Sequence, residues 1–224
     1  MRKKREFLRQ RFFQQINRVR MENLRSRISP HFTFNVLGRE INQFNGSEEV
    51  KHNLMELVKY LRRSLELTEK LSVSLQDELD FVRTYIELER GRVGEDFVAT
   101  VTVEDGLDAT RIMIPSMIVQ IPVENAIKHG LAGKDGKKEL SVYVSRETNG
   151  IRITVTDNGR GYLPQVVSTT RGTGTGLKVL YQTIQLLNTK NKSDKIRFDI
   201  TNRSDGQTGT EVSVYIPFRF SYDL

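Results

Sequence analysis

The hydrophobic periodicity of the chain changes near residue 71, and this change constrains the fold more than any other feature. Up to about residue 68, apolar residues recur at steps of three and four, which is the period of an amphipathic helix. After Gly94, short alternating stretches typical of strands are interleaved with helical stretches and turn residues. A chain that is helical first and mixed afterwards predicts two domains, which we place at residues 1–71 and 72–224.

The first part is predicted to be an antiparallel helical hairpin. One helix spans about residues 5–44 with a break at Ser29-Pro30, because proline lacks the backbone N–H that a helix interior needs. Asn45-Gly46-Ser47 forms a turn, and a second helix runs to about Thr68. Because two narrow apolar stripes bury little surface, we expect two copies to pair into a dimeric four-helix bundle.

The second part is predicted to be an α+β sandwich, a mixed sheet with helices on one face. Its third helix begins at Ser72–Ser74 and is ended by Gly91 and Gly94. Two strand hairpins turn at Asn149-Gly150 and at residues 204–206. The predicted helices are 75–91, 117–129 and 177–187, and the predicted strands are 97–103, 140–146, 151–156, 196–201 and 210–217.

The positive charge is concentrated at one end of the chain. The formal net charge is +7, and residues 1–27 hold ten basic and two acidic residues, so the remainder carries −1. A nearly neutral body argues against a nucleic-acid-binding surface, and we expect no direct nucleic-acid partner. The basic segment is either a solvated helix face or the cytoplasmic flank of a membrane helix. The absence of cysteine excludes disulfides and thiolate zinc sites.

Three clusters in the second part carry residues suited to binding a nucleotide. Taken singly, each has a common explanation as a turn, a flexible loop or a helix surface. Their order, and their positions on a helix, at a strand end and before a helix, favour one shared site. The clusters are Glu124–His129, Asp157–Gly161 and Gly172–Leu177.

The first cluster offers groups for a metal ion and for phosphate. Asn125 carries a neutral amide oxygen, a hard ligand that suits Mg²⁺, and Glu124 adds negative charge beside it. Lys128 follows three residues later on the same helix face and can meet phosphate charge. His129 completes the cluster, although a capping or packing role is the commoner one for such a residue.

The other two clusters suit a base and a phosphate chain. Asp157 can accept a hydrogen bond from the exocyclic amine of adenine, and Gly159 and Gly161 let the backbone approach a flat ring. Glycines before a helix N-terminus expose N–H groups to phosphate. The residues of this third cluster that we assign to nucleotide binding are Gly172, Gly174, Gly176 and Leu177. Neither a P-loop nor a convincing dinucleotide fingerprint is present.

These clusters resemble the N-box, G1-box and G2-box of the ATP-binding domain of histidine kinases and the wider GHKL ATPases. Gly209-Thr210 before the last strand matches the closing element of that domain, which adds Thr210 to the site. The resemblance implies a Bergerat-type sandwich that binds ATP, with Mg²⁺ held at Asn125 and a mobile lid from Tyr162 to Thr175.

Residues 28–37 resemble the His-box of LytS-type sensor histidine kinases. The resemblance implies that His31 accepts the γ-phosphoryl group of ATP in a homodimer and passes it to an aspartate of a response regulator, often of the LytTR type. A neutral imidazole is already nucleophilic near pH 7. Asn35 lies four residues on, on the same helix face, and can orient the imidazole or a water.

The whole sequence is therefore interpreted as the cytoplasmic portion of a sensor kinase that is anchored in the plasma membrane through an absent upstream segment. Three alternatives remain open. The chain could hydrolyse ATP without using His31, phosphorylate serine or threonine of a partner, or serve as a dimeric scaffold with a defective nucleotide site.

Overall fold

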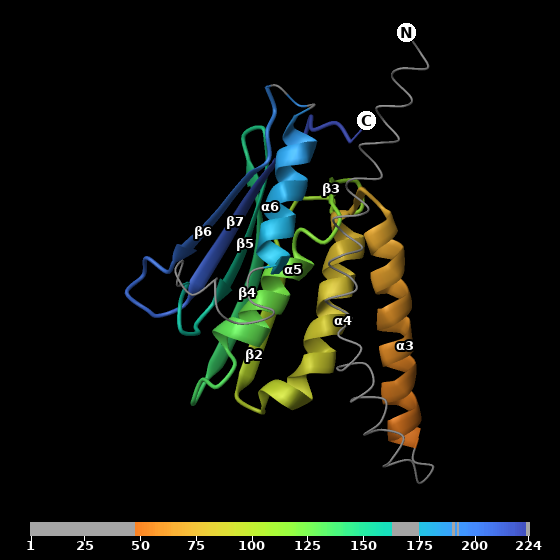
Figure 1. Ribbon diagram of the computed structural model, residues 1–224, viewed down its shortest axis with the longest axis vertical. Helices are drawn as coiled ribbons and strands as arrows, with labels where there is room; N and C mark the ends of the chain where they lie inside the picture. The colour runs from red at the N-terminus through yellow and green to blue at the C-terminus, as the bar shows by residue number, and fades with distance from the viewer. Residues whose placement is uncertain (1–47, 163–174, 190, 192, 223–224) are drawn as a thin grey trace. The chain divides into compact units, whose positions relative to one another are not determined.

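The computed structural model describes residues 48–162, 175–189, 191 and 193–222, and the chain divides into two compact units, Met1–Lys70 and Leu71–Leu224 (Figure 1). In the first unit, α3 spans Glu48–Glu69 and confirms the predicted second helix. Leu57 and Leu67 are buried side chains of α3, as its apolar stripe requires. The predicted first helix, the turn at 45–47 and the four-helix bundle depend on residues outside the described ones and stay predictions.

The second unit is built on a mixed five-stranded sheet in the order β2-β4-β5-β7-β6. β2 runs parallel to β4, and every other neighbouring pair is antiparallel. All five strands confirm predicted ones to within a few residues. Their bounds are β2 Phe97–Val103, β4 Lys138–Glu147, β5 Gly150–Asp157, β6 Arg197–Asn202 and β7 Thr210–Pro217.

Helices cover one face of this sheet (Figure 1). They are α4 Leu75–Val93, α5 Gln120–Asn125, the π-helical turn η1 Ala126–Gly130 and α6 Thr175–Asn188. Alternate strand residues such as Val142, Ile153 and Val214 are buried, whereas Tyr143, between buried Val142 and Val144, is exposed. The unit is thus a two-layer α/β sandwich, and the predicted α+β fold class is confirmed.

The segment before α4 is a correction to the prediction. Ser72–Ser74 forms a short strand, β1, which pairs antiparallel with β3, Met113–Pro115. Only Ser74 acts as predicted for a helix start, because its side chain accepts the amide of Asp77 at 3.0 Å. The helix ends at Gly94, whose φ is 115°, and Gly91 lies inside it.

The helix predicted at 117–129 is also corrected. Met117 lies in a turn with φ 69°, α5 begins only at Gln120, and the chain widens into η1 after Asn125. Leu131 N donates to the carbonyl of Ala126 at 2.8 Å, which is the five-residue spacing of a π-helix.

The first hairpin turns one residue earlier than predicted. Thr148 and Asn149 form the turn, and Gly150 is already the first residue of β5. A Cβ at Gly150 would lie 2.3 Å from the carbonyl oxygen of Ile216 in β7. Glycine is therefore required there for strand packing rather than for the turn itself.

Candidate functional site

The carboxylate of Asp157 is the centre of the site. It lies at the end of β5 and is 3% exposed, and its Oδ1 accepts amides of Gly159 at 2.7 Å and Thr210 at 3.4 Å. Burial raises the pKa of Asp157, because desolvation outweighs the hydrogen bonds from Gly159 and Thr210 that favour the ionised form. Both backbone amides bond Oδ1, and the side chain of Thr210 adds a further hydrogen bond to the carboxylate.

Three glycines form a tight cradle around this carboxylate. A Cβ at Gly130 would lie 2.8 Å from Asp157 Oδ1, and one at Gly159 would lie 2.1 Å from the carbonyl oxygen of Gly130. At Gly209, where φ is 139°, a Cβ would lie 1.9 Å from the backbone oxygen of Asp157. The structure thus brings together Gly130, which directly follows the first cluster, the second cluster and the Gly209-Thr210 element, which lie far apart in the sequence.

Asn125, the last residue of α5, presents an oxygen rather than a nitrogen to its surroundings. Its Nδ2 donates to the carbonyl of Ile121 at 2.9 Å, which directs Oδ1 away from the helix. No group of three or more His, Asp or Glu side chains among the described residues is arranged to hold a metal ion. This donor set fits Mg²⁺, because Mg²⁺ takes few protein ligands and keeps waters and phosphate oxygens as the rest.

Glu124 and Lys128 form an ion pair on the same helical segment. Lys128 Nζ lies 3.1 Å from Glu124 Oε2, and Gln120 Nε2 donates to Glu124 Oε1 at 3.1 Å. The ammonium also lies 5.9 Å from the ring centroid of Tyr85. To contact a phosphate, the ammonium of Lys128 must therefore either break its ion pair with Glu124 or contact Glu124 and the phosphate at the same time.

His129 is half-buried beside two cations. Desolvation lowers the pKa of His129, and the charges of Lys128 and Arg160 lower it further. Arg160 also donates from Nε to the carbonyl oxygen of His129 at 2.8 Å, so it joins the second cluster to the first. Arg160 was not predicted as a site residue, because its only signal in the sequence is its place between two cluster glycines.

We expect Arg160→Ala to raise the pKa of His129 toward its ordinary value of 6.5, because a nearby positive charge is removed. An NMR titration of the His129 ring proton measures this shift. Arg152→Ala is the matched control, because Arg152 is bonded to Glu147 and Ser213 instead. An unchanged His129 pKa in Arg160→Ala would contradict the assignment.

The lowered pKa of His129 also predicts that the free energy of unfolding depends on pH. Because the folded-state pKa of His129 lies below 6.5, its contribution to stability is present above pH 6.5 and is lost as the pH falls toward the folded-state pKa. Arg160→Ala should narrow the pH range over which this stability is lost. Thermal melts between about pH 5 and pH 8 would measure the change.

The second hairpin holds the chain just after the second cluster. Asn202 Oδ1 accepts the amide of Tyr162 at 2.6 Å, and Asn202 Nδ2 donates to the carbonyl of Tyr162 at 3.3 Å. Gly161, with φ 84°, packs here, since a Cβ would lie 2.7 Å from Asn202 Oδ1. Asn202 was missed by the sequence analysis, because nothing in a strand-end asparagine reveals a partner forty residues away.

The third cluster is described only in part. Gly176 and Leu177 lie in the first turn of α6, where Gly176 is buried and Leu177 is half-buried, and α6 packs against α5. Gly172, Gly174 and the predicted lid between Tyr162 and Thr175 fall on residues outside the described ones. So do His31 and Asn35.

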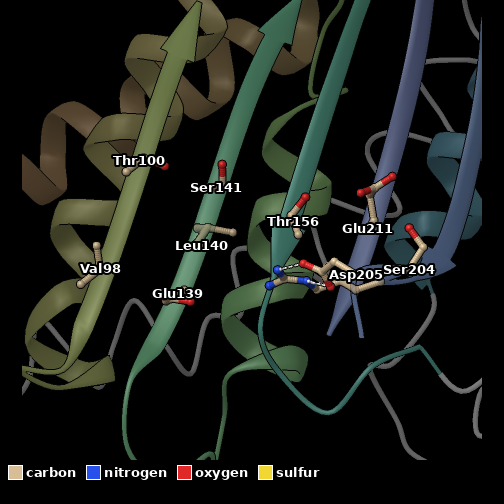
Figure 2. Close-up of a pocket in the computed structure, with 10 residues that line it drawn as sticks. Val98, Thr100, Glu139, Leu140, Ser141, Thr156, Ser204, Asp205 and Glu211 are labelled. Atoms are coloured by element: carbon tan, nitrogen blue, oxygen red, sulfur yellow. Dashed lines mark hydrogen bonds and ion pairs between the residues drawn. The ribbon is translucent and has the colours of Figure 1, made fainter. Parts of the chain in front are cut away.

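An open groove of about 450 Å³ lies on the sheet (Figure 2), and its lining includes Thr156, which precedes Asp157 in β5, and Arg203, whose backbone amide donates to the carbonyl of Gly209. Figure 2 shows polar side chains of neighbouring strands around it, with Asp205 at one end. The carboxylate of Asp205 accepts Nε of Arg203 at 3.1 Å. Its lining residues are Val98, Thr100, Glu139, Leu140, Ser141, Thr156, Arg203, Ser204, Asp205 and Glu211. None of them was predicted as a site residue.

Comparison with known protein families matches two profiles in succession. The family described as "Histidine kinase" matches residues 19–97. The family described as "Histidine kinase-, DNA gyrase B-, and HSP90-like ATPase" matches residues 110–219 and includes the whole Asp157 cradle.

Individual relatives are similar over most of this chain. Sensor histidine kinase/phosphatase LytS of Staphylococcus aureus strain MRSA252 is 30% identical over 207 residues, which is 88% of this chain and 34% of LytS. Sensor histidine kinase YpdA of Escherichia coli K12 is 28% identical over 202 residues, 90% of this chain and 34% of YpdA. The chain therefore spans about a third of the length of these relatives.

A solved histidine kinase domain from the blue-light activated kinase of Erythrobacter litoralis EL346 is 16% identical, with 93% of each chain covered and a TM-score of 0.49. Within the described part of the chain, no helix is both long and apolar enough to cross a membrane. The two profiles follow one another along most of the sequence, and the chain belongs to the histidine kinase family, with an ATPase domain of the kind shared with DNA gyrase B and HSP90.

Proposed function

We propose that this chain is the kinase portion of a two-component sensor, in which the second unit binds ATP and His31 receives its γ-phosphoryl group. The observation that carries the proposal is the buried Asp157 carboxylate in its glycine cradle. Asp157 lies in the part of the chain that matches the ATPase family. The part that matches the histidine kinase family precedes it in the sequence and includes residue 31.

In this proposal Asp157 recognises the adenine. Its Oδ2 accepts the exocyclic amine, while Gly159 and Thr210 hold Oδ1. Glycine at 159 and 161 lets backbone approach the ring, and His129 borders the same site. The N–H groups at the start of α6 receive phosphate. The residues assigned to that last role are Gly172, Gly174, Gly176 and Leu177.

Asn125 Oδ1 is the oxygen proposed to hold Mg²⁺, with Glu124 adding negative charge beside it and Lys128 meeting phosphate charge. When bound, the ion would neutralise phosphate charge. The chain's own contribution is to fix that oxygen at the end of α5, which continues into η1, whose last residue Gly130 is packed on Asp157.

The transfer step needs an imidazole nitrogen in line with the γ-phosphorus. A ring nitrogen of neutral His31 forms a bond to phosphorus, the bond from phosphorus to the β–γ bridging oxygen breaks, and ADP leaves with that electron pair. The ring proton passes to water. Asn35, one helical turn on, is proposed to hold the imidazole in the reactive tautomer. Transfer to an aspartate carboxylate of a response regulator then restores the histidine.

The assembly and location are proposed from the family. The relatives bear the names of sensor histidine kinases, so we place the chain in a homodimer that serves a response regulator, with the LytTR type as the first candidate. The +8 segment at residues 1–27 suits the cytoplasmic flank of a membrane anchor supplied by an upstream segment.

The site of phosphorylation tests the proposal. The 224-residue chain is incubated with Mg²⁺ and ATP, and phosphopeptides are mapped by mass spectrometry under neutral conditions. We expect phosphate on His31 that is labile in acid and stable in base. Phosphate on serine or threonine would favour a Ser/Thr kinase, free phosphate without modified protein would favour an ATPase, and no turnover with no ATP binding would indicate a scaffold.

A further inference from the structure

A buried carboxylate on α4 holds the segment that leads into α5. Glu78 is 0% exposed, and its Oε2 accepts the amide of Met117 at 2.8 Å. Its Oε1 accepts the amides of Val119 at 2.6 Å and Gln120 at 3.3 Å. Hydrogen bonds of this charge-assisted kind are stronger than neutral ones and compensate the cost of burying the charge.

These bonds replace a local cap on α5. The residue before α5, Val119, makes no side-chain capping hydrogen bond, and the acceptor for the first amides comes from α4 instead. Met117 has φ 69°, a left-handed conformation that a methionine adopts only where its surroundings impose it. Glu78 therefore fixes both the turn and the point at which the helix begins.

The geometry transmits this constraint to Asn125. α5 has six residues, so it is only about 9 Å long and behaves as a rigid rod between its two ends. Glu78 holds the first end, and beyond the second end Gly130 packs against Asp157 and Gly159. Asn125 lies between these two anchors, and a change at either one shifts its amide oxygen.

We propose that Glu78 is a positioning residue for Asn125, fixing the N-terminal end of α5 so that the asparagine oxygen meets the metal-bound phosphates of ATP. The inference rests on the proposed nucleotide site and extends it to a residue 47 positions earlier in the chain. Glu78 itself touches neither metal nor nucleotide.

The test compares Glu78→Gln with a matched variant on the same helix. Glu89 is also buried, at 2% exposure, but bonds Arg92 Nε at 2.5 Å and lies about 16 Å further along α4. Calorimetry on the full chain measures affinity for ATP with Mg²⁺ and for ADP in EDTA. We expect Glu78→Gln to weaken Mg²⁺-dependent ATP binding by about fivefold or more, with metal-free ADP affinity within about twofold of wild type. Glu89→Gln should change neither.

A double-mutant cycle separates positioning from general stability. If Glu78 acts through Asn125, then Glu78→Gln added to Asn125→Ala removes no further Mg²⁺-dependent affinity. Equal losses for ADP and Mg²⁺-ATP, additive losses in the cycle, or wild-type affinity in Glu78→Gln would each overturn the proposal.

Two further outcomes are distinguishable. If Glu78→Gln does not fold, Glu78→Asp keeps the charge and is measured the same way, with a smaller but still metal-selective loss expected and an unselective loss overturning the role. A wild type that binds ATP without any gain from Mg²⁺ would remove the positioning role alone. A wild type that does not bind ATP would overturn the proposed nucleotide site itself.

Discussion

Asp157→Asn is expected to weaken ATP binding roughly tenfold to hundredfold, which is the effect of losing one charge-assisted hydrogen bond in a buried site. Asparagine can still accept the amides of Gly159 and Thr210 on one oxygen. The other terminal group of asparagine is an NH₂ group, which is a hydrogen-bond donor. At the position of Oδ2 it would face the amine donor of adenine, so no hydrogen bond can form. Calorimetric titration with ATP measures the change.

The same substitution should leave the unliganded fold at least as stable as wild type near pH 7. The folded-state pKa of Asp157 is raised above its ordinary value of 3.8, so ionisation is penalised in the fold and stability falls as the pH rises from 3.8 through the raised pKa. Asparagine removes that penalty, and the difference between variant and wild type should vanish at lower pH. Thermal melts across this range measure it.

Asp199→Asn is the control for this pair of measurements. Asp199 is exposed on the edge strand β6, and the change should alter neither ATP affinity nor the pH profile. Unchanged ATP affinity in Asp157→Asn, or a large loss of stability at pH 7, would mean that the carboxylate serves packing rather than recognition.

Gly159→Ala is expected to disrupt the cradle most strongly. Its Cβ would lie 2.1 Å from the carbonyl oxygen of Gly130, so the first and second clusters would have to separate. Such overpacking costs about 1–3 kcal/mol, which for a unit of this size lowers Tm by roughly 2–12 °C. ATP affinity should fall as well, because Asp157 and Gly130 move apart. Thermal melts and nucleotide titration measure both effects.

Gly91→Ala is the matched glycine substitution. Gly91 lies inside α4, and a Cβ at this position would meet nothing within 4 Å. Alanine should therefore stabilise the helix by about 0.5–1 kcal/mol and leave ATP affinity unchanged. If Gly159→Ala behaves like Gly91→Ala in both measurements, the cradle is not the tight junction that the distances indicate.

The sequence predicted the sheet well because its strands alternate strictly. Val142 and Val144 are buried in β4 while Tyr143 between them is exposed, and a period of two identifies such a strand without tertiary information. β1 and β3 were missed because each has three residues, too few for a period to be read.

The helix predicted at 117–129 starts later than predicted and changes to a π-helical turn before its end, and both differences have tertiary causes. Glu78, far back in the sequence, takes the amides of Met117 and Val119, so the helix starts late. At its other end Gly130 must reach Asp157, and the wider π-helical turn accompanies that contact. The periodicity of a local stretch of sequence carries no information about Glu78 or Asp157, because both lie far away in the chain.

The residues of the candidate site differ in the same way: some could be predicted from the local sequence and others could not. Asp157, Asn125 and the cluster glycines were predicted from residue type and position, and the structure joins Asp157 and Gly159 in one cradle with Gly130, which was not predicted as a site residue. Arg160, Asn202 and Glu78 were not, because each acts through a backbone group of a distant segment. Sequence patterns mark groups that meet a ligand more readily than groups that hold those residues in place.

We propose above that ATP held by the Asp157 cradle phosphorylates His31. In the most direct test, wild type, Asp157→Asn and His31→Gln are each incubated with the same subsaturating concentration of γ-labelled ATP. Bound nucleotide and acid-labile phosphate on the protein are then measured in the same samples. We predict that wild type shows both, that Asp157→Asn loses both, and that His31→Gln keeps the bound nucleotide but carries no label. Label on His31→Gln equal to wild type, or undiminished label on Asp157→Asn, would contradict phosphoryl transfer from this cradle to His31.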